Sequence, residues 1–290
     1  MPNVQHQNAT VQILVPLAVV GVACFYRYYH RKVRAANQAL ELLKQQWTAE
    51  QNELKARLVE TDSASCLQKQ EGEFPQLKFV GGVDISFLKN DPEKAVACVA
   101  VLSFPELKVV SSHFKVVTMD QPYIAGFLAF RECSFLQQLL ESVRQQNPDA
   151  FPQLIFVDGN GKLHHRGFGL ACQLGVLENI PTIGIGKNLL LVDGMDKKEQ
   201  LSRFKRKRET ASASDSGPII SPLEGASGSV WGNAVAFNRT VTNPIFVSIG
   251  HRISLSTATE LAIKSSLYRV PEPVRQADIL SRQYVRKHLA

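Results

Sequence analysis

Hydrophobic residues between Lys78 and Val117 fall into three runs separated by short polar segments. The runs read KFVGGVDISF, AVACVAVLSF and LKVVSSHFKVV, and the separators KNDPEK and PE are rich in turn-forming residues. Apolar runs of this length between turn signals are typical of β-strands. The short connections favour pairing between neighbours, so the pattern predicts three antiparallel strands in a meander.

Beyond residue 120 the pattern alternates between helical and strand-like segments. PYIAGFLAFRE leads into CSFLQQLLESVRQQNP, which predicts a helix that ends at Pro148. QLIFVDGNG and PTIGIGK are short apolar strands, and GFGLACQLGVL between them is typical of a helix. A strand, a helix and a second strand joined by short connections predict parallel pairing of the two strands.

The segment from Val192 to Gly217 is polar, basic and poor in periodicity, so we expect a long surface loop there. SVWGNAVAF and PIFVSIGHRIS predict later strands, and residues 256–267 and the tail PEPVRQADILSRQYVRKH predict helices. Three antiparallel strands, then helix, strand, helix and strand, is the order of an RNase H-like fold. We therefore predict an α/β protein with a mixed sheet, antiparallel then parallel, flanked by helices.

The first 60 residues follow a different pattern. Val11 to Tyr26 carries no charge and precedes the basic stretch RYYHRKVR. Its 16 residues fall just short of the roughly 17–25 that span a bilayer, and Ala9 and Thr10 could extend it. Residues 1–30 are thus a candidate membrane anchor, with residues 9–26 as the tether and the rest of the chain in the cytosol. A buried helix or an artefact of gene prediction is the alternative.

Leucines at helical spacing predict an amphipathic linking helix over residues 31–60, and residues 61–290 would form the main domain. The chain has 290 residues, 44% of them hydrophobic, which suffices for one sizeable core. A net charge of +7 suits an anionic partner such as nucleic acid or a membrane surface. The five scattered cysteines favour a reducing compartment and argue against a disulfide framework or a zinc site.

Three carboxylates stand out against this apolar pattern. Asp84 lies inside FVGGVDISF, and Asp158 ends LIFVD. An ionised carboxylate in such a strand is costly unless it is paired or binds a cation. Glu132 either lies on the apolar stripe of a helix that starts at Ile124, or sits at the entry of a helix that starts near Cys133.

Carboxylates on neighbouring elements can hold Mg²⁺, which needs only one or two direct protein carboxylates and keeps several waters. The bound ion could activate water for phosphoryl chemistry. Glycines beside Asp158 would let backbone amides approach a ligand. The alternative is that the acids cap helices or pair with Arg131 and Arg166. Three acids at strand or helix ends favour a metal site.

Two further side chains follow predicted strands. His251 comes after PIFVSIG and could act as a general acid–base or donate a hydrogen bond to a phosphate. Lys187 comes after TIGIG and could meet a phosphate. A lone histidine is more often structural, so the residues by themselves leave both roles open.

Taken together, VGGVDISF, PYIAGFLAFRE, VDGNGKLHHRGFG, GIGK, SIGHRISL and PEPVRQAD resemble the endonuclease V family, most closely its animal form. The resemblance covers roughly residues 47–287. It implies an RNase H-like fold and Mg²⁺-dependent cleavage of nucleic acid at the second phosphodiester bond 3′ to inosine. Mn²⁺ could substitute for Mg²⁺.

The resemblance also implies roles for individual residues. Asp84 and Asp158 would be the metal ligands and Glu132 the third catalytic carboxylate, with Lys187 and His251 as the active-site lysine and histidine. The residues that would bind the flipped inosine are the wedge Tyr123, the pocket glycines Gly126, Gly159 and Gly161, and the pocket walls Leu128 and Leu190. Extrusion of the base fits this chemistry, because a purine changed at its six position is read at its edge.

The resemblance leaves the substrate open between single-stranded RNA and deoxyinosine in DNA, where the enzyme would act in repair. Ala125 replaces the proline of bacterial relatives after PYI, which could loosen the wedge. The resemblance implies a location in the cytoplasm, nucleus or nucleolus, and we expect the catalytic domain to be monomeric. The basic stretch from Lys197 to Arg208 could follow a phosphate backbone, act in nuclear import, or be a solvated loop.

Overall fold

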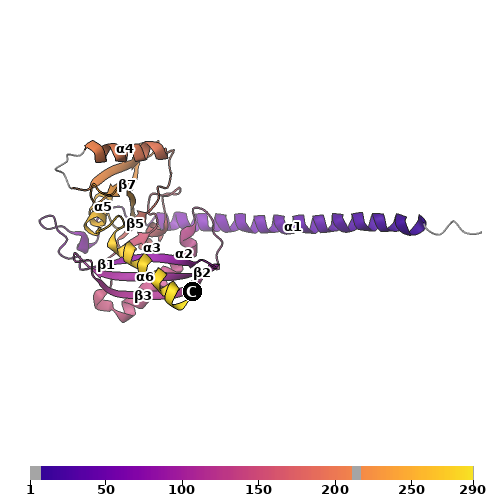
Figure 1. Cartoon of the computed structure of the whole chain (residues 1–290), viewed down its shortest axis with the longest axis horizontal. Coiled ribbons are helices and arrows are strands. Elements are labelled where there is room, and N and C mark those ends of the chain that lie inside the picture. The colour runs from indigo at the N-terminus through magenta and orange to yellow at the C-terminus, as the bar shows by residue number, and fades with distance from the viewer. Residues whose placement is uncertain (1–7, 211–216, 290) are drawn as a thin grey trace, which may run out of the picture. The chain divides into compact units, whose positions relative to one another are not determined.

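The computed structural model describes residues 8–210 and 217–289, and for residues 8–25, 27 and 28 it describes the helix without its side chains. The chain divides into two compact units, residues 1–50 and 51–290. Helix α1 (Asn8–Lys55) accounts for the described part of the first unit and begins the second (Figure 1). The predicted linking helix therefore belongs to α1.

No helix among the described residues is both long and apolar enough to cross a membrane. The predicted anchor falls on residues 9–26, and apart from Tyr26 their side chains lie outside the described part of the chain.

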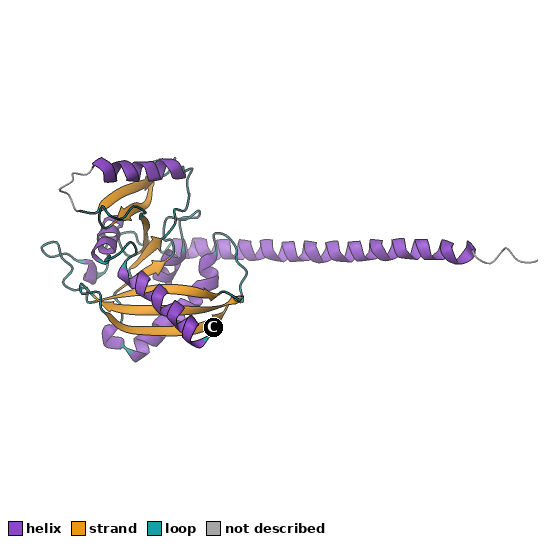
Figure 2. Ribbon diagram, viewed as in Figure 1, coloured by secondary structure: helices purple, strands orange, loops and turns teal. Residues whose placement is uncertain are grey.

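One mixed sheet organises residues 51–290 (Figure 2). Its strand order is β3-β2-β1-β4-β5-β8-β7-β6. The strands are β1 (Phe79–Leu88), β2 (Asp91–Ser103), β3 (Val109–Thr118), β4 (Leu154–Asp158), β5 (Thr182–Gly186), β6 (Ile219–Glu224), β7 (Val230–Ala236) and β8 (Ile245–His251).

The pairing within the sheet confirms the predicted meander and parallel unit. Strands β1, β2 and β3 pair antiparallel, while β4 pairs parallel with β1 and with β5. Strand β8 returns antiparallel to β5, and β7 and β6 continue antiparallel. The sequence did not predict β6, because Pro222 interrupts its short alternating pattern. The RNase H-like arrangement itself is confirmed.

Helices cover both faces of the sheet. They are α2 (Leu128–Gln146), α3 (Leu170–Glu178), α4 (Lys197–Thr210), α5 (Leu255–Lys264) and α6 (Glu272–His288), with short 3-10 turns η1 (Ser65–Leu67) and η2 (Pro148–Ala150). Val83 and Val157 pack in one core with α2 and α3. Val80 and Phe156 pack in another core with α5 and α6. Alternate residues of a strand point to opposite faces, so Asp84 and Asp158 share the α6 face.

Helix α6 lies directly on β1 because Gly82 has no side chain. A Cβ atom at Gly82 would lie 1.8 Å from the carbonyl oxygen of Pro273. This close approach brings the first turns of α6 over the strand that carries Asp84. The glycine therefore helps to set the distance between the two elements that line the site described below.

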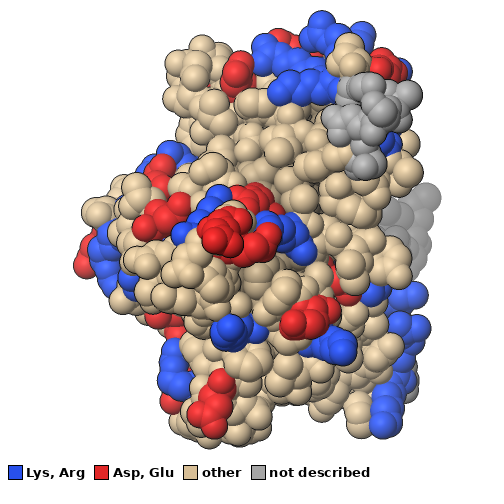
Figure 3. All heavy atoms as spheres, turned by 90° about the vertical axis from the view of Figure 1, so that its left-hand side faces the viewer, with Lys and Arg blue, Asp and Glu red and all other residues tan. Residues whose placement is uncertain are grey.

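The segment that we expected to be a surface loop contains helix α4, so that prediction is wrong in part. Ion pairs between Arg203 and Glu199 and between Lys205 and Glu209 join successive turns of α4. Only Gln200 and Phe204 are buried in α4. Two positions are too few to form the apolar stripe from which an amphipathic helix is predicted in a sequence. The blue side chains at the top of Figure 3 gather where α4 lies.

Candidate active site

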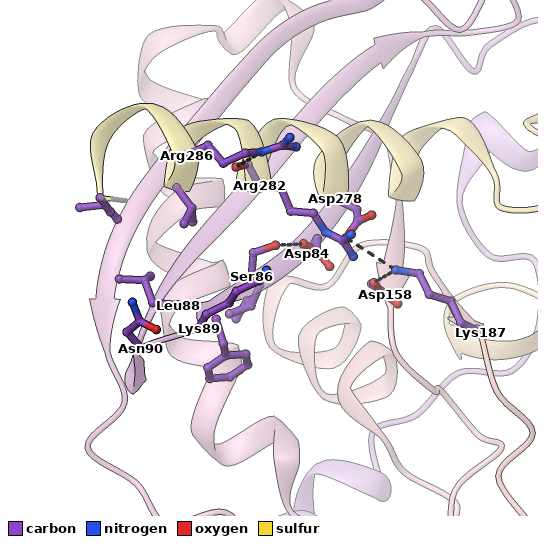
Figure 4. A pocket seen from close by; sticks show the side chains of 14 residues that line it. Asp84, Ser86, Leu88, Lys89, Asn90, Asp158, Lys187, Asp278, Arg282 and Arg286 are labelled. Carbon is purple, nitrogen blue, oxygen red and sulfur yellow. Dashed lines mark hydrogen bonds and ion pairs between the residues drawn. The ribbon is translucent and has the colours of Figure 1, made fainter.

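A pocket of about 890 Å³ opens between the end of β1, the end of β4 and helix α6 (Figure 4). It contains the carboxylates of Asp84, Asp158 and Asp278 and the cations of Lys187 and Arg282. The structure therefore brings together three of the five predicted catalytic residues. It adds an aspartate to which the sequence had assigned no role.

Asp84 projects from β1 toward α6. Its carboxylate accepts hydrogen bonds from Ser86 Oγ at 3.1 Å and from Ser281 Oγ at 3.0 Å. Burial, together with the neighbouring carboxyl of Asp158, raises the pKa of Asp84 to about 7. Two carboxyls this close gain from a cation placed between them, because a shared positive charge removes their repulsion.

Asp158 ends β4, and Lys187 directly follows the adjacent parallel strand β5. The Nζ atom of Lys187 donates to Asp158 Oδ2 at 2.6 Å and lies 3.9 Å from Asp278 Oδ1. Burial alone would lower the pKa of Lys187, but the hydrogen bond with Asp158 and the charges of both aspartates raise it above its ordinary value. Lys187 is therefore a fixed ammonium on the wall of the acidic pocket.

Glu132 reaches the same region from the other face of the sheet. It lies in the second turn of α2, is buried, and does not line the pocket itself. Burial and the charge of Asp84 raise the pKa of Glu132 to about 7, after Arg131 has offset part of the effect. Glu132 is thus coupled electrostatically to the pocket, and the helix begins at Leu128, between the two starts considered from sequence.

Asp278 is the functional residue that the sequence reasoning missed. It stands on α6 and forms an ion pair with Arg282 at 2.8 Å, four residues later. An acid and a base at this spacing usually mark a solvated helix face. Only the packing of α6 on β1 turns this face toward Asp84. The motif PEPVRQAD pointed to the segment but not to this carboxylate.

His251 does not join the carboxylates. It pairs with Thr182 at the start of β5, whereas Asp158 pairs with Ile185 near the end of that strand. Three residue steps of a strand separate these positions by about 10 Å. His251 Nδ1 instead accepts a hydrogen bond from the amide of Val59 at 3.3 Å. The catalytic role predicted for His251 is thus not matched by a place in this pocket, because β8 runs antiparallel to β5 and carries His251 to the other end of that strand from Asp158.

His251 lies in a separate groove with Arg57 and Arg252. Burial, together with the charges of the two arginines, lowers the pKa of His251 to about 4. The imidazole is therefore neutral near pH 7. This environment suits a neutral imidazole that accepts a hydrogen bond from the backbone following α1.

Most of the residues predicted to bind inosine lie on or next to two loops. Tyr123, which is 69% exposed, and Gly126 belong to the β3–α2 loop, and Leu128 begins α2. Gly159 and Gly161 belong to the β4–α3 loop. Leu190 lies apart from both loops, beside the small core around Phe204.

Buried Gln51 ties the two loops together. Its amide nitrogen donates to the carbonyl of Phe168 at 2.8 Å and to that of Gly126 at 3.4 Å, and its oxygen accepts from Arg166 Nε. The guanidinium of Arg166 lies 5.4 Å from the ring centroid of Phe127. The wedge loop and the glycine-rich loop therefore form one connected surface.

The three glycines differ in what they can offer a base. The amide of Gly159 donates to the carbonyl of Ile185 at 3.1 Å, and that of Gly161 donates to Ser248 Oγ at 2.9 Å. Both amides are thus already used within the protein, so neither is free to donate to a base in this conformation. The amide of Gly126 has no such partner among the described residues and remains the candidate donor.

The pocket fits a divalent cation with few protein ligands. Among the described residues no three His, Cys, Asp or Glu side chains form a ready-made metal cage. Asp84 and Asp158 nevertheless lie together on one wall, and Asp278 faces them across the pocket. Mg²⁺ commonly takes one or two carboxylates and fills its remaining positions with water and phosphate oxygens. Hard oxygen donors of this kind suit Mg²⁺ or Mn²⁺ better than zinc.

Comparison with known proteins gives consistent matches. The family model of endonuclease V matches residues 61–279. The human protein of that name is 46% identical over 244 residues, which is 84% of this chain and 83% of the human chain.

Two solved structures share the fold. The catalytic domain of human endonuclease V superposes with a TM-score of 0.80 at 44% identity, covering 86% of this chain and 98% of that one. Endonuclease V of Ciona intestinalis, bound to a 23-mer DNA with an inosine followed by a ribo-adenosine, gives a TM-score of 0.76 at 35% identity. That match covers 84% of this chain and 98% of that one.

Proposed function

Because the chain belongs to the endonuclease V family, a family of nucleases that act on inosine-containing nucleic acid, we propose that it is a Mg²⁺-dependent endoribonuclease. Its substrate would be single-stranded RNA that contains inosine, cut at the second phosphodiester bond on the 3′ side. The observation that carries this proposal is the pair Asp84 and Asp158, held together in one pocket beside Lys187.

Asp84 and Asp158 would hold the metal ion, with Asp278 within reach across the pocket. When bound, Mg²⁺ supplies a lowered pKa for a coordinated water and a positive charge for the phosphoryl transition state. Lys187 would meet a non-bridging phosphate oxygen, because its ammonium already faces this wall. Glu132, whose pKa is raised to about 7, could hold or release a proton near neutral pH.

The exposed ring of Tyr123 would fill the space that the extruded base leaves in the strand, since an aromatic ring can replace lost stacking. The amide of Gly126 would donate to O6 of hypoxanthine. Adenine presents an amino group at this position and would be rejected, because two donors would then face each other.

One observation bears on the choice of RNA. The Ciona relative is bound to a 23-mer DNA in which a ribo-adenosine directly follows inosine. A ribonucleotide at that place carries the 2′-hydroxyl nearest to the proposed cut, and a protein can use that hydroxyl to distinguish RNA from DNA. The alternative is a repair enzyme for deoxyinosine in DNA. Either substrate would place the activity in the cytoplasm or the nucleus.

The test uses the full chain with Mg²⁺ and two end-labelled oligonucleotides of one sequence, RNA and DNA, each with a single inosine. We expect cleavage of the RNA one nucleotide beyond inosine, loss with EDTA, and at least a thousandfold loss in Asp84→Asn. The exposed Asp149→Asn serves as the control and should cleave normally. Preferential cleavage of DNA would support repair, and cleavage by Asp84→Asn would refute the proposed metal site.

A further inference from the structure

The loop between α5 and α6, which leads into the helix that lines the acidic pocket, presents two large exposed side chains. Leu267 is 59% exposed and Tyr268 is 58% exposed. Neither has a role in the site described above. An exposed aromatic ring at the rim of a nuclease pocket can act as a platform for a nucleobase, because every base has a π-face.

The ring of Tyr268 is backed by a cation that is itself held in place. The guanidinium carbon of Arg275 lies 4.4 Å from the ring centroid. Arg275 donates from Nε to Glu272 Oε1 at 2.6 Å and from Nη2 to Oε2 at 3.0 Å, and Glu272 is buried. This two-point contact fixes the guanidinium plane. The aromatic–cation pair is therefore organised before any ligand arrives.

Two connections place the platform next to the pocket. Arg269 donates from Nη2 to the carbonyl oxygen of Lys187 at 2.6 Å, so the loop is fastened to the residue that contacts Asp158. Arg275 stands three residues before Asp278 on α6, a rise of about 4.5 Å along the helix axis. A strand whose phosphate entered the pocket would thus pass within reach of Tyr268.

We infer that Tyr268, backed by Arg275, stacks against a nucleobase that flanks the cleaved phosphodiester and is distinct from the extruded inosine. This inference rests on the proposed nuclease function. Stacking on a tyrosine ring tolerates any base, so the platform would orient single-stranded RNA without selecting its sequence. It would lie outside the inosine-binding loops, which carry Tyr123 and Gly126.

The first part of the test locates the contact directly. The full chain is mixed with inosine RNA that carries 5-iodouridine at one position at a time, from two nucleotides before inosine to three after it. The mixture is irradiated, and crosslinked peptides are identified by mass spectrometry. We expect one flanking position to crosslink to Tyr268. The crosslink should be absent in Tyr268→Ala and retained in Tyr268→Phe, which keeps the ring.

The second part measures whether the contact is stacking. An abasic nucleotide at the crosslinked position should raise KM about tenfold for the wild type and for Tyr268→Phe, as expected for the loss of one stacked base. The same abasic nucleotide should change KM less than twofold for Tyr268→Ala, because that variant has no ring on which the base could stack. Equal KM increases in all three proteins would overturn the inference.

Crosslinking does not depend on cleavage, so the two proposals can fail separately. A wild-type protein that cleaves inosine RNA but never crosslinks through Tyr268 would overturn the platform and leave the nuclease function standing. This outcome would also be expected if Leu267 and Tyr268 served as a docking surface for another protein. A crosslink to Tyr268 without any cleavage would support the platform and overturn the nuclease function.

Discussion

The ammonium of Lys187 lies 2.6 Å from Asp158 Oδ2 and 3.9 Å from Asp278 Oδ1, so a single cation touches carboxylates from β4 and from α6. These two acids are 120 residues apart in the sequence and meet only because α6 packs along β1. The lysine compensates part of the negative charge that a metal ion would otherwise have to neutralise alone. It also offers a donor to a phosphate oxygen.

The variant Lys187→Met should therefore cleave inosine RNA on the order of 100-fold more slowly. This is the usual effect of removing one hydrogen-bond donor that stabilises charge in the transition state. The effect should fall on kcat, because the ammonium would act on charge that develops during cleavage. Single-turnover rates at saturating Mg²⁺ measure this. The control Lys162→Met removes an ion pair with Glu60 outside the pocket and should keep its rate within about threefold. Equal losses in both variants would contradict the role of Lys187.

The raised pKa of Asp84 predicts how stability depends on pH in the metal-free protein. Its pKa is raised from 3.8 to about 7 on folding, so the folded state keeps a proton that the unfolded state releases above about pH 4. The stability that this proton contributes is complete below about pH 4 and is lost as the pH rises through 7.

We therefore expect Asp84→Asn to be more stable than the wild type at pH 8 without metal, by at least about 1.4 kcal/mol, the equivalent of one pKa unit. Urea unfolding between pH 5 and pH 8 in EDTA measures this difference. Adding Mg²⁺ at pH 8 should stabilise the wild type and leave Asp84→Asn unchanged, since ligand binding stabilises only a protein that has the site. Asp149→Asn should behave like the wild type, and a stability difference that is independent of pH would contradict the assignment.

The two aspartates of the sheet could be found from sequence because each interrupts or ends an apolar strand. Asp278 could not, since the ion pair with Arg282 looks like an ordinary exposed helix pair and its neighbours in space lie far away in sequence. Helix α4 was missed because charge pairs rather than an apolar stripe accompany it. The separation of His251 from the carboxylates could not be predicted either, because a position at the end of a strand does not reveal the direction in which that strand runs in the sheet.

The position of His251 predicts that the imidazole is dispensable for chemistry. His251→Gln keeps a side-chain oxygen that can accept from the amide of Val59, so cleavage at pH 7.5 should stay within about threefold of the wild type. Its free energy of unfolding should fall by about 1 kcal/mol, since one imperfectly replaced hydrogen bond is worth about that much. Cleavage rates of His251→Gln and Asp84→Asn measured side by side show how large the loss of a catalytic residue is in the same assay. A folded His251→Gln protein without activity would restore the catalytic role inferred from sequence.

The same substitution should alter the response to acid. The pKa of His251 is lowered from 6.5 to about 4 by burial, so the unfolded state binds a proton that the folded state excludes between these values. The stability due to this group is present above about pH 6.5 and is lost as the pH falls toward 4. Urea unfolding at pH 7 and pH 5 should show a smaller loss in His251→Gln than in the wild type, and equal losses would contradict this explanation.

Gln51 should control how well the enzyme distinguishes bases, because its amide joins the wedge loop to the glycine-rich loop. Gln51→Ala removes donors to the carbonyls of Gly126 and Phe168, and Gln51→Glu keeps an acceptor for Arg166 but also loses both donors. Both variants should lose about 1–3 kcal/mol of stability, since buried acceptors are left without partners.

The decisive measurement is the ratio of kcat/KM for RNA with inosine to that for the same RNA with adenosine. We expect this ratio to fall at least fivefold in both variants, because the amide of Gly126 would no longer be held in place for O6. Gln145→Ala, an exposed glutamine of α2, is the matched control and should keep the ratio unchanged. If Gln51→Ala slows cleavage of both RNAs equally, Gln51 supports the fold and does not set the geometry of the base pocket.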